Sequence, residues 1–230
     1  MASSGKTKLL LRPLLKRRHD LAFSGRTLFF TPVTHYLRGV EFLSSRWHDA
    51  PHGVSFAQQL SSGTLWVMFS GHRNEQYEFG LNRDWHKDED RASRDLCEIM
   101  ERHALPPVEP IVNFPEHRKR RAYICGERGS PLFTLNAALG LCAQGDFDRA
   151  EKIAARCLKP GPWRYEFSAE QATDEIRYSE DLRWRLPYLL RTLQTDRSKV
   201  IPLLHDWEAF SVKNFGLTKY WKPTPFPCEL

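Results

Sequence analysis

The first third of the chain alternates between apolar and polar residues with the period of a β-strand. Leu65, Val67 and Phe69, for example, fall on one face of an extended segment, and Trp66 and Met68 fall on the other. The alternation predicts strands over residues 26–31, 35–43, 53–60, 64–71 and 75–81. Short turns separate these segments, and such connections join antiparallel neighbours because a parallel pair needs a long crossover. The pattern therefore predicts an antiparallel sheet of about five strands.

Apolar residues on both sides of this sheet recur at the three- and four-residue spacing of amphipathic helices. A leading basic helix is predicted over residues 7–22, and Pro13 fits its first turn if the helix begins near residues 11–12. Another helix follows the sheet and ends before Leu105. The acids at positions 88–90 begin it, where the helix dipole favours negative charge.

The second half of the chain is helical in pattern. Two helices flank a turn at Gly145, and a third is predicted over about 173–193, kinked or restarted at Pro187. A fourth is predicted over about 198–212, with Ser198 as its N-cap. The fold class is therefore α+β: an N-terminal helix, an antiparallel sheet, and a helical C-terminal half packed against that sheet.

Prolines mark the boundaries. Residues 105–130 form a proline-rich basic connector between a region at 1–104 and a helical region at 131–230, the whole forming one compact unit. The last residues, 220–230, combine proline with aromatic side chains. This composition predicts an extended tail held against the body of the protein.

The composition is that of a folded chain. With 230 residues, of which 41% are hydrophobic, the chain can bury a substantial core, which excludes a disordered protein. No run approaches the roughly 20 apolar residues of a membrane helix, and the basic N-terminus lacks the continuous apolar stretch of a secretory signal. We therefore expect a cytoplasmic protein without a membrane partner.

Five cysteines occur, at positions 97, 125, 142, 157 and 228, and none forms a CxxC pair. An odd count without metal-ligand spacing argues against a disulfide framework and against a zinc site. Cys97, Cys142 and Cys157 fall in helical patterns, where a buried thiol acts as a small hydrophobic side chain.

The net charge of +6 is concentrated near the N-terminus. Residues 1–31 carry seven basic side chains and one acid, so the rest of the chain is neutral overall. The candidate binding residues are two basic runs: Lys16, Arg17 and Arg18 in the leading helix, and Arg118, Lys119, Arg120 and Arg121 in the connector. Such runs are either solvated surface or a binding face for a nucleic acid or a protein. The second run lacks the interleaved aromatics that stack on bases.

Motifs that commonly mark catalytic sites are missing from the sequence, including the nucleophile elbow, the P-loop, the dinucleotide-binding glycines and the zinc protease and deaminase patterns. His35, His72 and His86 lie at or beside predicted strand ends, where a cleft could form an unrecognised active site. Asp88 and Asp90 beside His86 offer metal-binding atoms, but their place at a helix N-terminus accounts for them. We predict no cofactor and no metal.

One segment of the helical half, residues 139–160, resembles a single tetratricopeptide unit. Phe147 supplies the aromatic position, Ala150 the small residue for close helix packing, and Pro160 the stop. A solenoid needs about three such repeats, so one copy predicts a helical hairpin rather than a repeat array.

The order of a leading basic helix, the run Gly25-Arg26-Thr27-Leu28-Phe29-Phe30, further strands and then helices resembles a group of uncharacterised bacterial α+β proteins. The resemblance spans mainly residues 9–82 and implies an interaction or toxin-immunity role, without assigning functional residues.

Three hypotheses of function follow. The first is a non-enzymatic cytoplasmic protein that binds another, unidentified protein, with a toxin-immunity or adaptor role as one form of it. The positive charge argues against an inhibitor of a basic nuclease, which is usually acidic. The second is a nucleic-acid-associated protein that uses the two basic runs. The third is an enzyme with a site near the strand ends. The oligomeric state is left open.

Overall fold

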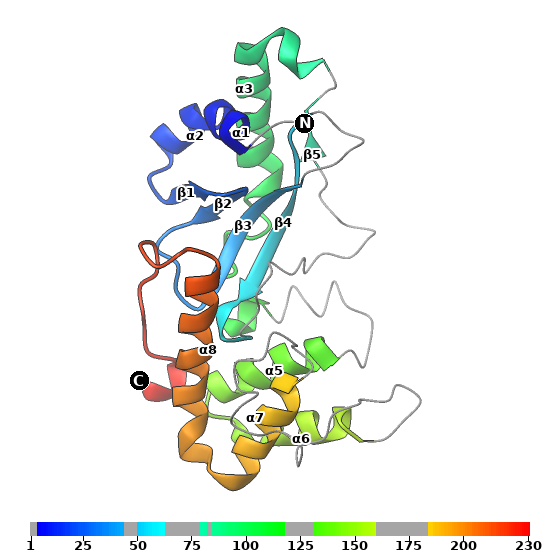
Figure 1. Cartoon of the computed structure of the whole chain (residues 1–230), viewed down its shortest axis with the longest axis vertical. Coiled ribbons are helices and arrows are strands. Elements are labelled where there is room, and N and C mark those ends of the chain that lie inside the picture. Colours follow the sequence, from blue (N-terminus) through cyan, green and yellow to red (C-terminus); the bar gives the residue numbers. More distant parts are fainter. Residues whose placement is uncertain (1–3, 44–49, 63–78, 82–83, 118–130, 160–183) are drawn as a thin grey trace. The chain divides into compact units, whose positions relative to one another are not determined.

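The computed structural model describes residues 4–43, 50–62, 79–81, 84–117, 131–159 and 184–230 (Figure 1). The chain divides into two compact units. Unit 1 comprises Met1–Gln58, Val67–Ile124 and Tyr220–Lys222, and unit 2 comprises Gln59–Trp66, Cys125–Lys219 and Pro223–Leu230. Several predicted features lie outside the described residues: the strand at 64–71, most of the strand at 75–81, His72, the basic run at 118–121, Cys125 and the start of the helix at 173–193.

An antiparallel sheet organises unit 1, as the alternation predicted. Its strands follow chain order: β1 (Leu21–Ser24), β2 (Thr27–Phe30), β3 (Tyr36–Leu43) and β4 (His52–Gln59), with the two-residue β5 (Phe79–Gly80) beside β4. β1 and β2 form a hairpin that pairs Leu21 with Phe30 and Ser24 with Thr27. Gly25 begins the two-residue turn with φ +60°, a conformation that glycine adopts without strain.

The leading helix ends earlier than predicted. Two short helices, α1 (Ser4–Leu10) and α2 (Arg12–Arg17), take the place of one helix over residues 7–22. Pro13 lies in the first turn of α2, as expected, because the missing N–H is not needed there. The prediction was wrong beyond Arg17: residues 21 and 23 are buried alternately in β1, where they satisfy the β-strand period instead.

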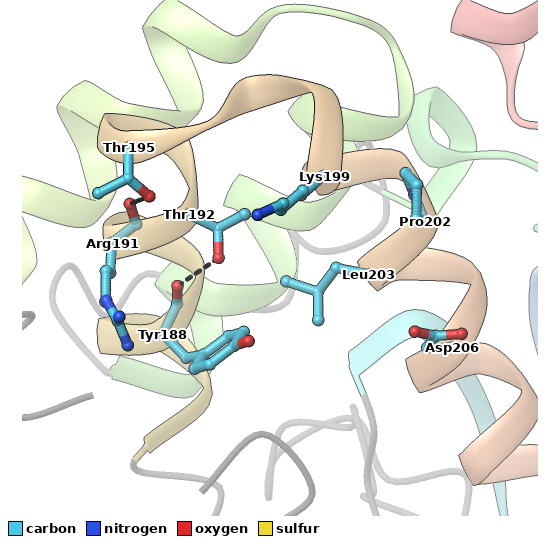
Figure 2. Close-up of a pocket in the computed structure, with 8 residues that line it drawn as sticks. All are labelled: Tyr188, Arg191, Thr192, Thr195, Lys199, Pro202, Leu203 and Asp206. Carbon is cyan, nitrogen blue, oxygen red and sulfur yellow. Dashed lines mark hydrogen bonds between the residues drawn. The ribbon is translucent and has the colours of Figure 1, made fainter. Parts of the chain in front are cut away.

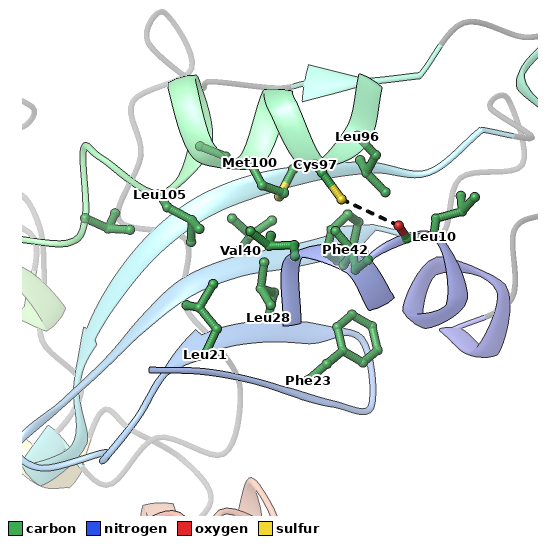
Figure 3. Close-up of a cluster of buried hydrophobic side chains, with 14 of the residues drawn as sticks. Leu10, Leu21, Phe23, Leu28, Val40, Phe42, Leu96, Cys97, Met100 and Leu105 are labelled. Carbon is green, nitrogen blue, oxygen red and sulfur yellow. Dashed lines mark hydrogen bonds between the residues drawn. The ribbon is translucent and has the colours of Figure 1, made fainter. Parts of the chain in front are cut away.

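Helices cover one face of this sheet (Figure 3). The short helix η2 (Trp85–Lys87) leads into α3 (Glu89–Ile99), which continues as a π-helical stretch, η3 (Met100–Ala104). The Asp88 side chain caps α3 by accepting a hydrogen bond from the Arg91 N–H at 2.9 Å, which confirms that the acids begin this helix.

The core of unit 1 lies between these helices and the sheet. The labelled members of the cluster in Figure 3 are Leu10, Leu21, Phe23, Leu28, Val40, Phe42, Leu96, Cys97, Met100 and Leu105. Each large side chain buried in this way stabilises the fold by about 1.5–3 kcal/mol. Gly39 marks a close approach of β3 to β2, because a Cβ at this position would lie 2.0 Å from the Leu28 carbonyl oxygen.

Unit 2 is helical, as the pattern predicted for the second half. Its elements are η1 (Leu60–Ser62), α5 (Pro131–Ala143), α6 (Phe147–Cys157), α7 (Arg185–Thr195), η6 (Arg197–Lys199), α8 (Val200–Asn214) and η7 (Pro227–Glu229). Gly145 makes the turn between α5 and α6 with φ +81°, and Asp146 caps α6 by accepting from the Arg149 N–H at 3.2 Å. A helical hairpin is therefore present at this position.

Two details of the third and fourth helices differ from, or refine, the prediction. Pro187 lies in the first turn of α7, so a helix begins there rather than being kinked. Asp196, not Ser198, provides the cap, and it caps η6, which leads into α8. Its Oδ1 accepts hydrogen bonds from the N–H and the hydroxyl of Ser198, at 3.1 and 2.6 Å, because a carboxylate is a stronger acceptor than a hydroxyl.

The C-terminal tail is held in place, as its aromatic residues predicted. In unit 1, Trp221 forms a parallel bridge with Val33, and the Tyr220 ring packs edge-on against Phe29 at 5.1 Å. In unit 2, Phe226 is only 2% exposed. None of the described helices combines the length and apolarity that crossing a membrane requires.

Candidate functional site

A cleft of about 390 Å³ lies between α7 and α8 in unit 2 (Figure 2). One wall comes from a single face of α7, because residues 188, 191, 192 and 195 are three, four and seven positions apart. The facing wall follows the same spacing, with Lys199 at the end of η6 and Pro202, Leu203 and Asp206 on α8. Two rows of side chains at helical spacing therefore face one another across a short connection.

The connection between the helices positions Lys199. Asp196 holds the preceding turn through its hydrogen bonds to Ser198, and its other carboxylate oxygen lies 3.5 Å from the Lys199 ammonium. These hydrogen bonds lower the pKa of Asp196, so it is charged at neutral pH. Figure 2 shows Lys199 and Leu203, on the wall formed by η6 and α8, directed toward Thr192 on α7.

The opposite wall presents hydroxyl oxygens as acceptors. The Thr192 hydroxyl donates to the Tyr188 carbonyl oxygen, and the Thr195 hydroxyl donates to the Arg191 carbonyl oxygen, both at 2.9 Å. Since each proton is used within α7, the oxygens offer lone pairs to a ligand rather than a proton. The donors that line the cleft are therefore the cations Arg191 and Lys199 and the phenol of Tyr188.

Packing behind the cleft holds the helices rigid. The guanidinium of Arg185 is buried over the rings of Trp207 and Phe210, at 4.7 and 5.4 Å, and Tyr188 packs against Trp207 at 6.2 Å. At the connection, Arg197 pairs with Asp148 and Glu151 of α6 at 2.8 and 2.9 Å. α7, η6 and α8 are thus tied to the rest of unit 2, which keeps the walls of the cleft in register.

The lining combines both charges with apolar surface. Two cations and one carboxylate, Asp206, surround a floor of Leu203 and Tyr188, which are 2% and 8% exposed. Small-molecule sites are mostly apolar with few polar groups, whereas protein-binding surfaces place an apolar centre inside a polar rim. In this cleft, charged side chains on both walls surround the apolar floor.

The structure places the predicted basic residues of the leading helix at ion pairs in unit 1. Arg17 forms a bidentate contact with Glu101, at 3.0 and 3.1 Å. Arg18 contacts Asp20 at 2.7 and 2.8 Å and Glu109 at 2.8 Å. Arg18 lowers the pKa of Asp20 through these hydrogen bonds.

Lys16 is exposed on α2 and has no ion pair within 4 Å among the described residues. Arg118, Lys119, Arg120 and Arg121 lie outside the described residues.

Two smaller clefts lie in unit 1. One, of about 290 Å³ between α2 and α3, contains the Arg17–Glu101 pair with Cys97 beside it, and the thiol of Cys97 points to the Leu10 carbonyl oxygen at 3.6 Å. Burial raises the pKa of this thiol, which makes it a poor nucleophile. The other, of about 310 Å³, lies beside Trp85 and Arg91. Both also combine apolar lining with charged side chains, and the α7–α8 cleft differs from them in its greater volume.

The histidines proposed for an enzyme site do not share a described cleft. His35 is half-buried just before β3, His86 is exposed on η2, and His72 lies outside the described residues. Within the described part of the chain, no three histidine, cysteine, aspartate or glutamate side chains are grouped to hold a metal ion.

Sequence reasoning missed the α7–α8 cleft. The signal that could have indicated it is the pair of rows at helical spacing, 188/191/192/195 and 199/202/203/206, on either side of the cap at Asp196. No protein-family model, no curated protein and no solved structure matches this chain.

Proposed function

We propose that this chain is a protein-binding protein and that its partner inserts a segment into the cleft between α7 and α8. The observation that carries the proposal is the lining of the cleft, in which Arg191, Lys199 and Asp206 surround the floor formed by Tyr188 and Leu203. A complementary segment presents an acidic side chain next to an apolar one. The acid pairs with Arg191 and shares Lys199 with Asp196, while the apolar side chain packs over the small exposed part of the Tyr188 and Leu203 floor.

The ion pairs of unit 1 favour this proposal over nucleic-acid binding. A phosphate-binding face needs basic side chains that are available to exchange counterions for phosphates. Two of the three residues of the first basic run, Arg17 and Arg18, are instead engaged by Glu101, Asp20 and Glu109. The proposal includes two roles: the partner is a toxin if the protein is an immunity protein, and a target protein if it is an adaptor.

Affinity capture from a lysate of the protein's own cell, at low and at high salt, tests the proposal when variants are compared. The cleft variant carries Arg191→Glu and Lys199→Glu. Its matched control carries Lys152→Glu and Arg156→Glu, which make the same change of charge at exposed positions of α6 in the same unit. Circular dichroism confirms that both variants are folded before capture.

We expect the wild type and the control variant to retain the same protein at high salt, and the cleft variant to retain at least tenfold less of it. Equal retention by both variants would overturn the assignment of the cleft. Recovery of nucleic acid that is lost steeply as salt rises would favour the nucleic-acid hypothesis instead.

A further inference from the structure

The C-terminal segment of unit 2 is clamped at two points. The Phe226 ring is buried against the ring of His205 on α8, with ring centroids 4.5 Å apart. The Glu229 carboxylate lies 2.8 Å from Nε2 of His205 and also accepts the Phe226 N–H at 2.7 Å. Cys228 lies between these anchors in the short helix η7, so its position is fixed from both sides.

The clamp places Cys228 over the C-terminal end of α5. Its Cβ lies 3.3 Å from the point that a Cβ on Gly145 would occupy, and the N–H of Gly145 donates to the Cys142 carbonyl oxygen at 2.9 Å. A side chain at position 145 would therefore crowd Cys228, and the φ of +81° at this position also favours glycine. Cys228 is exposed, whereas Cys142 beneath it is fully buried, and both are free thiols.

Cys228 also affects the electrostatics of Cys142. Burial raises the pKa of Cys142 to about 12, and the proximity of Cys228 contributes to the rise. Burial and the neighbouring Glu229 raise the pKa of Cys228 as well. Like-charge repulsion of this kind is felt only between groups that lie close together.

We propose that Cys142 and Cys228 form a reversible disulfide that fixes the C-terminal tail to α5, with a low-molecular-weight disulfide as the oxidant. The Cys228 thiolate attacks one sulfur of the external disulfide, forms a mixed disulfide and releases one small thiol after protonation. The Cys142 thiolate then attacks Sγ of Cys228 and releases the second small thiol. Two protein thiols lose two electrons and two protons, and the external disulfide gains them.

The order of attack follows from exposure. Of these two thiols, Cys228 is the one exposed to a dissolved disulfide, and the buried Cys142 meets its partner from within the protein. Because both thiols have raised pKa values, the rate should increase with pH. The resulting loop encloses α6, α7, η6 and α8, and therefore the cleft described above.

Disulfide mapping of the full chain tests this site. The protein is equilibrated with glutathione disulfide at pH 8.5, free thiols are then alkylated, and cross-linked peptides are quantified by mass spectrometry. The same reaction in 8 M urea (about the concentration that unfolds most domains) gives the distribution that chain connectivity alone produces. Cys228→Ser removes the exposed partner, and Cys157→Ser, at a half-buried position on α6, is the matched control.

We expect the Cys142–Cys228 link to dominate in the native protein, at least tenfold above any other pair, and to persist in Cys157→Ser. It should be lost in urea in favour of pairs closer in sequence. Amide hydrogen exchange of residues 223–230 should slow at least tenfold on oxidation and recover on reduction. A native pattern matching that in urea, or a native protein without this link, would overturn the proposal.

Discussion

Gly39 is a position at which the sheet of unit 1 has no room for a single added methyl group. β2 and β3 pair there, with Phe29 opposite Gly39 and Leu28 opposite Val40. A Cβ on residue 39 would lie 2.0 Å from the Leu28 carbonyl oxygen and 2.7 Å from the Phe29 Cα. Both atoms belong to the backbone, so no side-chain rotation relieves the overlap. We therefore predict that Gly39→Ala separates the two strands.

The cost can be worked out from this geometry. An ordinary carbon–oxygen contact is about 3.3 Å, so the strands must move apart by about 1.3 Å. Overpacking of a buried site costs about 1–3 kcal/mol, and each weakened ladder hydrogen bond adds about 0.5–1.5 kcal/mol. Alanine restricts the unfolded chain and returns about 0.4–1 kcal/mol. The free energy of unfolding should fall by about 2–4 kcal/mol.

Urea unfolding, monitored by circular dichroism and tryptophan fluorescence, measures the fall in the free energy of unfolding. Hydrogen exchange of peptides that span β2 and β3 shows whether the destabilisation lies in these strands. Gly5→Ala, at an exposed position in α1, is the control and should change stability by no more than about 1 kcal/mol. If Gly39→Ala unfolds within about 0.5 kcal/mol of the wild type, β2 and β3 do not meet in this register.

Two further predictions concern unit 2. Because folding raises the Cys142 pKa from 9.0 to about 12, stability is unaffected below pH 9 and falls as pH rises through this interval. At pH 10 the free energy of unfolding should be lower than at pH 7 by on the order of 1 kcal/mol. Chemical unfolding of Cys142→Ala should show a decline that is smaller by this amount. An identical decline in the wild type and the variant would contradict the prediction. Phe226→Ala should lower the free energy of unfolding by about 2 kcal/mol, because a buried ring is lost, and should speed hydrogen exchange of residues 223–230. Unchanged exchange in this variant would show that Phe226 does not anchor the tail.

Local sequence patterns predicted the elements whose stability is local. Alternation of apolar residues identified the antiparallel sheet, and the acids at 88–90 marked the start of α3, because an N-cap and a helix dipole act within one turn. The predicted helix also extended over Leu21 and ended at residue 22, just before Phe23. Only pairing with β2 makes Leu21 and Phe23 part of a strand, and that pairing requires the turn at Gly25.

The candidate site depends on contacts that no local pattern contains. Arg191 and Asp206 lie on different helices and face one cleft only because the cap at Asp196 turns the chain between them. The same holds for Arg17, whose charge predicted a binding face. Its partner Glu101 is distant in sequence, and the ion pair exists only once α2 packs against α3. Charge runs can be found in a sequence, but acids that neutralise them from distant positions, such as Glu101 and Glu109, cannot.

Site-specific photo-crosslinking tests the central claim, that a partner occupies the α7–α8 cleft, most directly. A benzophenone amino acid replaces Thr195, which is exposed and lines the cleft, or Lys152, which is exposed on α6, in the tagged full-length chain. Irradiation in a lysate of the protein's own cell should give a covalent adduct with one protein from position 195 and none from position 152. When the chain with the crosslinker at position 195 also carries Arg191→Glu and Lys199→Glu, the yield of that adduct should fall at least tenfold. A partner that is captured but crosslinks from position 152 and not from position 195 would contradict the account.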